Sequence, residues 1–168
     1  MSKVKVQSPV QNPIVHLPSY KKWRVPGTYV DQVVGSLGLT LMYPNGVRKW
    51  YHYTDNIGRA ALLPHLILKS DLYKADAFTC INYAFEVWNV CGKTYGLNTW
   101  VPVIGKIPGT TVRHAWNLIM VGDETGLLKE EFTYFEPNNG WEMGQLLELA
   151  YQSFPIGEEG YTGEFILY

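Results

Sequence analysis

Residues 78–85 read Phe-Thr-Cys-Ile-Asn-Tyr-Ala-Phe and place a cysteine, Cys80, in the first turn of a predicted helix. Asp76 or Thr79 can cap this helix, and the apolar run that follows ends before Gly92, a residue suited to the position just past a helix end. A thiol at a helix start lies near the positive end of the helix dipole and near unsatisfied backbone N–H groups. Both favour the thiolate, which is the nucleophilic form. The stretch therefore predicts a helix with a nucleophile at its N-terminus.

The same helix has a second interpretation. Cys80, Ala84, Val87 and Cys91 recur at helical spacing and form one apolar stripe. Because unpaired cysteine is among the most buried residue types, Cys80 is also readable as a small core residue. The two cysteines lie about 16 Å apart along a helix that rises about 1.5 Å per residue, which is too far for a disulfide. We expect two free thiols, as in a reducing compartment.

The chain of 168 residues is 46% apolar and 17% charged, which is typical of one globular domain that buries its own core. No apolar run approaches the roughly 18 residues of a membrane-spanning helix, and the polar start lacks the core of a signal peptide. Four histidines without paired Cys/His spacing predict no metal site, and we expect no cofactor. We expect a cytoplasmic or virion-associated protein without a membrane partner.

Residues 1–28 contain four prolines and five lysine or arginine residues but no acidic residue, and they are interpreted as an extended, basic, Pro-rich arm. Residues 29–168 are expected to form a single domain. Such an arm is either a flexible terminus or a strap across the domain or a neighbouring subunit, so a protein partner or self-association through the arm is a hypothesis.

Charge is unevenly spread along the chain. Up to Arg113 there are 13 basic and 5 acidic residues, whereas from His114 onward 10 acidic residues stand against Lys129 alone. Either the two halves complement each other in the fold, or one of them presents a charged surface to a partner. The net charge of −1 argues against a nucleic-acid partner.

Hydrophobic patterns and turn residues predict the other elements. They are a hairpin over 39–43 and 47–53, a short helix over 59–68 with Pro64 inside or at its start, a strand over 99–104 and a loop over 105–110, a hairpin over 112–121 and 128–136, a helix over 141–151 and a last strand over 164–168.

In the second hairpin, one face of each strand is almost wholly apolar. The first strand presents Trp116 and Leu118 together with His114, and the second presents Tyr134 together with Glu136. A buried carboxylate without a partner is costly, so Glu136 needs one, and His114 is the candidate. The pair is either a structural contact within the sheet or an imidazole oriented by a carboxylate to act as a general base.

The register decides whether the two side chains meet. If Val121 pairs with Leu127, His114 faces Tyr134 and Glu136 is its diagonal neighbour. A shift by two residues places His114 opposite Glu136. A shift by one would separate them but would also turn Tyr134 away from the apolar face, so hydrophobic parity favours the His–Glu pair.

Three segments in order resemble the transglutaminase-like branch of the papain-like cysteine enzymes. They are residues 78–85 around Cys80, then Arg-His-Ala-Trp-Asn at 113–117, then Phe-Glu-Pro-Asn at 135–138. The resemblance implies an α+β fold with a papain/transglutaminase-like core, in which the helix bearing the cysteine packs on an antiparallel sheet bearing the histidine and the acid.

The resemblance also assigns roles. Cys80 would be the nucleophile, His114 the base and Glu136 the orienting acid. Asn138 matches the polar residue after Glu-Pro and either donates to an oxyanion or caps a helix; otherwise the backbone N–H of Cys80 is the natural donor. At residues 79, 81 and 82 the chain lacks the acidic residues of the family pattern, so no calcium binding is expected from them.

Two hypotheses of different kind follow. The first is a thiol-dependent acyl-transfer enzyme, a cysteine peptidase or transglutaminase-like protein, that acts on a peptide or amide substrate through Cys80, His114 and Glu136. The second is a non-catalytic structural or interaction protein on the same fold, for example a component of a phage or other viral particle, with its site plugged by Trp100 or Trp116.

Overall fold

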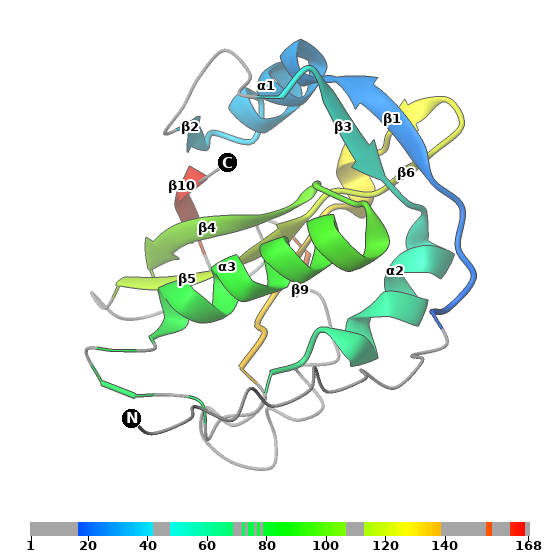
Figure 1. The fold of residues 1–168 in the computed structure, drawn as a ribbon. Coiled ribbons are helices and arrows are strands. Elements are labelled where there is room, and N and C mark those ends of the chain that lie inside the picture. The colour runs from blue at the N-terminus through cyan, green and yellow to red at the C-terminus, as the bar shows by residue number, and fades with distance from the viewer. Residues whose placement is uncertain are drawn as a thin grey trace, which may run out of the picture.

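The computed structural model describes residues 17–41, 48–68, 72, 74–75, 77, 79–106, 113–138, 154–155 and 162–166. These residues form a mixed α+β fold (Figure 1). The elements in chain order are β1 (Trp23–Pro26), α1 (Gly27–Gly35), β2 (Thr40–Leu41), β3 (Trp50–Tyr53), α2 (Asn56–Leu62), η1 (Leu63–His65), α3 (Cys80–Val90), η3 (Cys91–Tyr95), β4 (Trp100–Lys106), β5 (Arg113–Ile119), β6 (Gly122–Asp123), β7 (Gly126–Leu127), η4 (Lys129–Glu131), β8 (Thr133–Phe135), β9 (Phe154–Pro155) and β10 (Thr162–Ile166).

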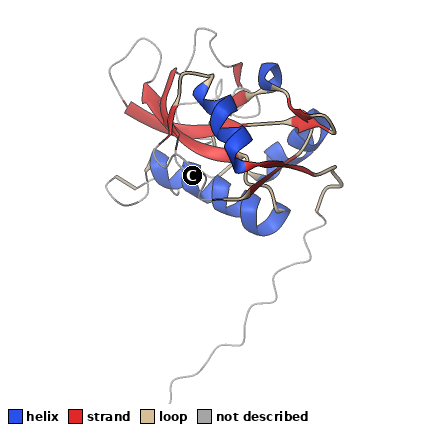
Figure 2. Ribbon diagram, turned by 90° about the horizontal axis from the view of Figure 1, so that it is seen from above, coloured by secondary structure: helices blue, strands red, loops and turns tan. Residues whose placement is uncertain are grey.

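The main sheet has the strand order β2-β10-β4-β5-β8-β9 and is antiparallel except for the pairing of β10 with β2. Its centre is the β4–β5 ladder, in which all seven residues of β5 have a partner on β4. Six of those seven residues are buried, from His114 to Ile119. The strand is therefore covered on both faces, as Figure 2 shows from above, with helices on either side of the strands.

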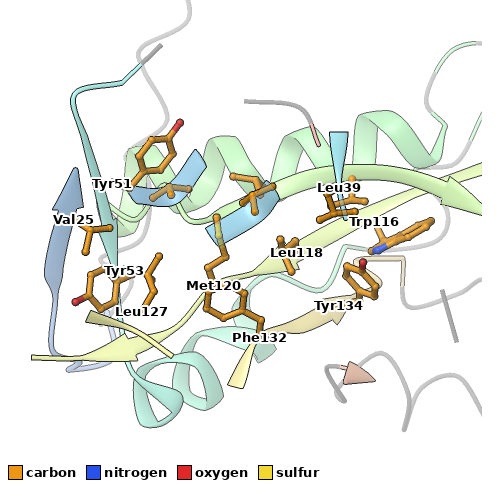
Figure 3. Close-up of a cluster of buried hydrophobic side chains, with 14 residues drawn as sticks. Val25, Leu39, Tyr51, Tyr53, Trp116, Leu118, Met120, Leu127, Phe132 and Tyr134 are labelled. Carbon is orange, nitrogen blue, oxygen red and sulfur yellow. The ribbon is translucent and has the colours of Figure 1, made fainter. Parts of the chain in front are cut away.

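Among the described residues the core forms two hydrophobic clusters, one on each face of the central strands. The first packs α1, β1 and β3 against one side of β4 and β5, and the second packs α2, α3 and η3 against the other. Figure 3 shows the first cluster, with Trp116 and Tyr134 near one end and Val25 and Tyr53 at the other. Each large apolar side chain that becomes fully buried contributes about 1.5–3 kcal/mol. The two clusters hold β5 rigidly between two layers.

Helix α3 begins at Cys80 because Thr79 provides the N-cap. Thr79 has extended backbone angles, and the Asn82 side chain accepts a hydrogen bond from the Thr79 N–H at 2.9 Å. The α-helix ends at Val90, close to the end predicted before Gly92. Gly92 does not stop the helical chain, however, because the chain continues as the single π-helical turn η3 and stops at Gly96, which has φ 65°. Gly96 can adopt this left-handed conformation without strain, and it therefore ends the helix.

The hairpin predicted over 39–53 is also wrong in its pairing. β2 pairs in parallel with β10, and β3 pairs with β1, so the two strands belong to different sheets. Both segments contain strands, as their sequence predicts, but β2 and β3 pair with other strands and not with each other. Residues 42–47, which hold the predicted turn, lie outside the described residues.

The sequence did not predict α1, and it assigned residues 23–28 to the arm. In the structure these residues form β1 and the start of α1, and Val25 belongs to the core. Residues 17–22 of the predicted arm are neither helix nor strand, whereas residues 1–16 lie outside the described residues, as does the helix predicted over 141–151.

The remaining predicted elements are present with shifted ends. The helix predicted over 59–68 is α2 followed by η1, in which Pro64 stands at the start. The predicted strands correspond to β4, β5, β8 and β10. In the described part of the chain no helix is long and apolar enough to span a lipid bilayer.

Candidate active site

Cys80 is the first residue of α3, and its side chain is half-buried. Thr79 is the N-cap residue and has extended backbone angles. The Asn82 side chain accepts hydrogen bonds from both the N–H and the hydroxyl of Thr79, at 2.9 and 3.3 Å. This short network fixes the first turn. The thiol is therefore held at the helix N-terminus, where the dipole and the unsatisfied N–H groups favour negative charge.

His114 and Glu136 lie on the same face of the sheet, as parity predicts, but neither proposed register is right. Tyr134 pairs with Leu118, not with His114, so the continuation of the ladder places Glu136 across from Trp116. Glu136 is thus a diagonal neighbour of His114. In the β6–β7 hairpin Gly122 pairs with Leu127. If the two long strands continued in that register, His114 and Glu136 would lie on opposite faces of the sheet. The three residues of η4 follow that hairpin and shift the register by three, which returns the two side chains to the same face.

The ladder between β5 and β8 stops early, and Pro137 explains why. In the described ladder β8 pairs with only the last three residues of β5, the last pair being Asn117 and Phe135. In this register the next hydrogen-bonded position would set Ala115 against Pro137, which has no N–H to donate. The Pro137 carbonyl instead accepts the N–H of Leu68 at 2.8 Å. The chain therefore leaves β5 at this point and opens the edge of the strand.

Cys80 occupies the edge that β8 leaves. The amide of Met120 donates to Thr99, on the β4 side, so the odd-numbered amides of this strand point to the β8 side. One of them, the N–H of Ala115, hydrogen-bonds the sulfur of Cys80, as does the N–H of Ile81. The thiol thus lies beside the open edge of β5, which is the strand that bears His114.

The three predicted site residues form one connected line of hydrogen bonds. The buried Nε2 of His114 lies 2.5 Å from Oε2 of Glu136, and the His114 side chain is hydrogen-bonded to that of Cys80. With Nε2 on the carboxylate, Nδ1 is the ring nitrogen left for the thiol. The other oxygen of Glu136 accepts the backbone N–H of Asn138 at 3.3 Å. The structure therefore brings Cys80, His114 and Glu136 together from three elements.

The electrostatics favour a charged thiolate and imidazolium. Burial acts to raise the pKa of Cys80, but the hydrogen bond and charge of His114 and the two backbone amides outweigh it, so this pKa lies below its ordinary value. Burial likewise acts to lower the pKa of His114, yet hydrogen bonds and charges of Cys80 and Glu136 raise it to about 9. Each partner stabilises the charged form of the other.

Asn138 is buried, and its backbone orients Glu136. The residue lies in the bridge that joins its segment to Leu68. The main chain of Asn138 therefore helps to position Glu136. A donor role of its side chain toward an oxyanion stays a prediction.

Trp116 and Trp100 were the predicted plugs of an inactive site, and both are fully buried. The Trp116 ring lies 6.1 Å from the His114 ring and packs edge-on against Tyr134 at 5.5 Å. Trp100 instead packs in the second cluster, against Phe135. Trp116 therefore supports the imidazole from the side, while Cys80 keeps part of its surface exposed.

Asn117 supports the site, although the sequence pattern assigns it no role. It is fully buried, and its Nδ2 donates to the Ala84 carbonyl at 2.9 Å, with a longer contact to the Trp100 carbonyl at 3.4 Å. The bond to Ala84 ties α3 to β5 one turn after Cys80. A polar residue at a position that alternation makes internal was the signal that could have identified it.

The described residues contain no group of three or more His, Cys, Asp or Glu side chains placed to hold a metal ion. No protein-family model, curated protein or solved structure matches the chain. The assignment of a function therefore depends on the geometry of the site.

Proposed function

We propose that the protein is a thiol-dependent acyl-transfer enzyme, a cysteine peptidase or transglutaminase-like protein built on a papain/transglutaminase-like core. The observation that carries the proposal is the hydrogen-bonded line from Cys80 through His114 to Glu136, with the thiol at a helix N-terminus. A nucleophile, a base and a group that orients the base are the three parts that such catalysis needs.

In the first half of the reaction, the Cys80 thiolate attacks the carbonyl carbon of an amide. The carbonyl oxygen becomes an oxyanion, and the backbone N–H of Cys80 at the start of α3 is the natural donor to it. His114 then gives its Nδ1 proton to the leaving amine as the C–N bond breaks. The products of this half are a free amine and a thioester on Cys80.

In the second half, water or an amine attacks the thioester, and His114 takes up the proton of the attacking group. The C–S bond breaks, the acyl product leaves, and the thiolate–imidazolium pair is restored. Glu136 keeps the imidazole in the orientation that points Nδ1 at the sulfur. Peptides or other amides are the proposed substrates.

The test compares Cys80→Ala with Cys91→Ala, because both variants remove one thiol from the same helix. Hydrolysis of a fluorogenic peptide library and incorporation of a fluorescent amine into casein measure the two outcomes of the thioester. We expect activity in the wild type and in Cys91→Ala and none in Cys80→Ala. A wild type that is folded yet inactive in both assays, and whose Cys80 reacts no faster than Cys91, would favour the non-catalytic alternative.

A further inference from the structure

The outward side of α3 carries a depression in two adjoining parts that the proposed reaction does not use. One part is a groove of about 340 Å³ lined by Asn82, Phe85, Glu86, Trp88 and Asn89. The other is a pocket of about 220 Å³ lined by Arg48, Trp88, Asn89, Gly92, Lys93 and Asn98. We call them the α3 groove and the basic pocket. They share Trp88 and Asn89 and therefore adjoin each other along α3.

This depression faces away from the thiol. At about 100° of rotation per residue, Asn82, Phe85 and Asn89 lie on the opposite side of the helix from Cys80. The side that Cys80 shares is buried, at Ala84 and Val87. A ligand in the depression would therefore leave the line from Cys80 to Glu136 unobstructed.

The basic pocket forms the positively charged end of the depression. Among the described residues that line it, the charged ones are the cations Arg48 and Lys93, and the Arg48 guanidinium lies 5.1 Å from the centre of the Trp88 ring. A planar guanidinium held over an aromatic ring keeps its N–H groups directed outward, which suits bidentate binding of a carboxylate.

Further cations lie on and just before the neighbouring strand β1, which pairs with β3. Asn98, on its wall, donates to the Trp50 carbonyl at 3.2 Å and accepts the His52 N–H, so the pocket adjoins β3. The ring of Trp50 carries the Arg24 guanidinium at 4.5 Å. Burial and then the charges of Lys22 and Arg24 lower the pKa of His52, which indicates a positive field over this surface.

The α3 groove is different in character, since it is aromatic and mostly uncharged. Phe85 is 37% exposed and packs edge-on against Trp88 at 5.9 Å. On the same exposed side, one turn earlier, Ile81 is 40% exposed. Among the described residues that line the groove, the charged one is Glu86. The depression therefore runs from an apolar end near the start of α3 to a cationic end near η3.

We propose that this surface binds an extended acidic peptide segment, with apolar residues of the segment in the α3 groove and its carboxylates in the basic pocket. From Asn82 to Lys93 the helix rises about 16 Å, the length of about five extended residues. Charge complementarity selects the occupant: the cations bind carboxylates at one end, whereas Glu86 would repel a phosphate backbone that followed the whole depression. The proposal does not depend on the activity of Cys80.

The experiment measures fluorescence anisotropy with a fluorescein-labelled peptide in which leucine and phenylalanine precede a run of glutamates. We expect saturable binding that weakens with added salt, and an increase of about tenfold in Kd for Lys93→Glu and for Arg48→Glu. Lys74→Glu is the matched control, since Lys74 is an exposed lysine outside the depression, and it should bind as the wild type does. Circular dichroism checks that each variant is folded.

Two further probes define the apolar and charged parts. Phe85→Ser should weaken binding of the same peptide, and a peptide with glutamine in place of every glutamate should bind at least about tenfold more weakly. Equal Kd values for the glutamate and glutamine peptides, or for the wild type and Lys93→Glu, would overturn the proposal.

Other occupants give distinguishable results. A single-stranded oligonucleotide of matched charge that binds more tightly than the peptide, and loses affinity in Lys93→Glu, would overturn the proposal in favour of nucleic acid. Self-association seen by light scattering, absent in Lys93→Glu and without peptide binding, would assign the surface to a second copy of the chain. Because binding is measured without turnover, an inactive Cys80 would leave this result unchanged.

Discussion

The two cysteines of this chain stand at opposite ends of the same helical segment and differ in every property that matters for reactivity. Cys80 is half-buried at the N-terminus of α3, and its pKa lies below the ordinary value because His114 and two backbone amides stabilise the thiolate. Cys91 is fully buried at the start of η3, and burial alone raises its pKa well above the ordinary value. The comparison shows that the position in the fold, and not the residue type, decides in which direction the pKa of a thiol shifts.

The largest expected effect is on alkylation. We expect iodoacetamide to modify Cys80 at least about 10³-fold faster than Cys91, because the pKa of Cys80 is lowered and its side chain is partly exposed, while Cys91 reacts only when the helix opens. Mass spectrometry of digested protein after timed labelling measures both rates. The midpoint of the pH dependence for Cys80 should lie below the ordinary thiol pKa of 9.0. Equal, slow labelling of both thiols in the folded protein would remove the contrast.

The second effect tests what holds the imidazole in place. We expect Glu136→Gln to reduce acyl-transfer activity by about 10²-fold, since the amide keeps the shape but not the charge that orients and stabilises the imidazolium. In the proposed mechanism the pair acts only while His114 is protonated, so wild-type activity should fall as the pH rises through about 9. Glu136 raises this pKa, and its loss should move the alkaline limb to lower pH.

A pH–rate profile of kcat/KM measures this shift, with Glu130→Gln as the matched control because Glu130 is an exposed carboxylate on η4. An alkaline limb that stays near the wild-type position in Glu136→Gln would mean that Glu136 does not act on His114.

The third effect concerns the tie between α3 and β5. Asn117→Ala removes the donor to the Ala84 carbonyl and leaves that buried carbonyl without this bond. We expect the free energy of unfolding to fall by about 1–3 kcal/mol. Labelling of Cys80 should slow by a few-fold, because the helix start is held less well beside β5. Urea denaturation and timed labelling measure the two quantities, and an unchanged labelling rate would limit Asn117 to a structural role.

The smallest effect belongs to the other thiol. Cys91→Ala deletes one buried atom from the second cluster, and we expect a loss of about 1 kcal/mol in unfolding free energy. Activity should stay within about twofold of the wild type when assayed well below the melting temperature. A folded Cys91→Ala variant without activity would contradict the division of roles between the two thiols.

The site was more predictable than the fold around it. Helix α3 and its N-cap followed from local sequence, and the shared face of His114 and Glu136 followed from hydrophobic parity, because one-residue slips would expose large apolar side chains. The pairing of β3 with β1 was not predictable in the same way. A strand pattern states which face is buried but not which distant strand will supply its hydrogen bonds.

By itself, the sequence determined where a helix starts with a thiol, which strand faces are apolar, and that Glu136 needs a partner in the core. These properties follow from the local periodicity of side chains and from the cost of burying charge. Only the tertiary structure decided that η4 restores the parity of the ladder, that Pro137 releases the edge of β5, and that Cys80 takes that edge. The reason is geometric: contacts between segments far apart in the chain depend on register and on backbone hydrogen bonds, which no local pattern encodes.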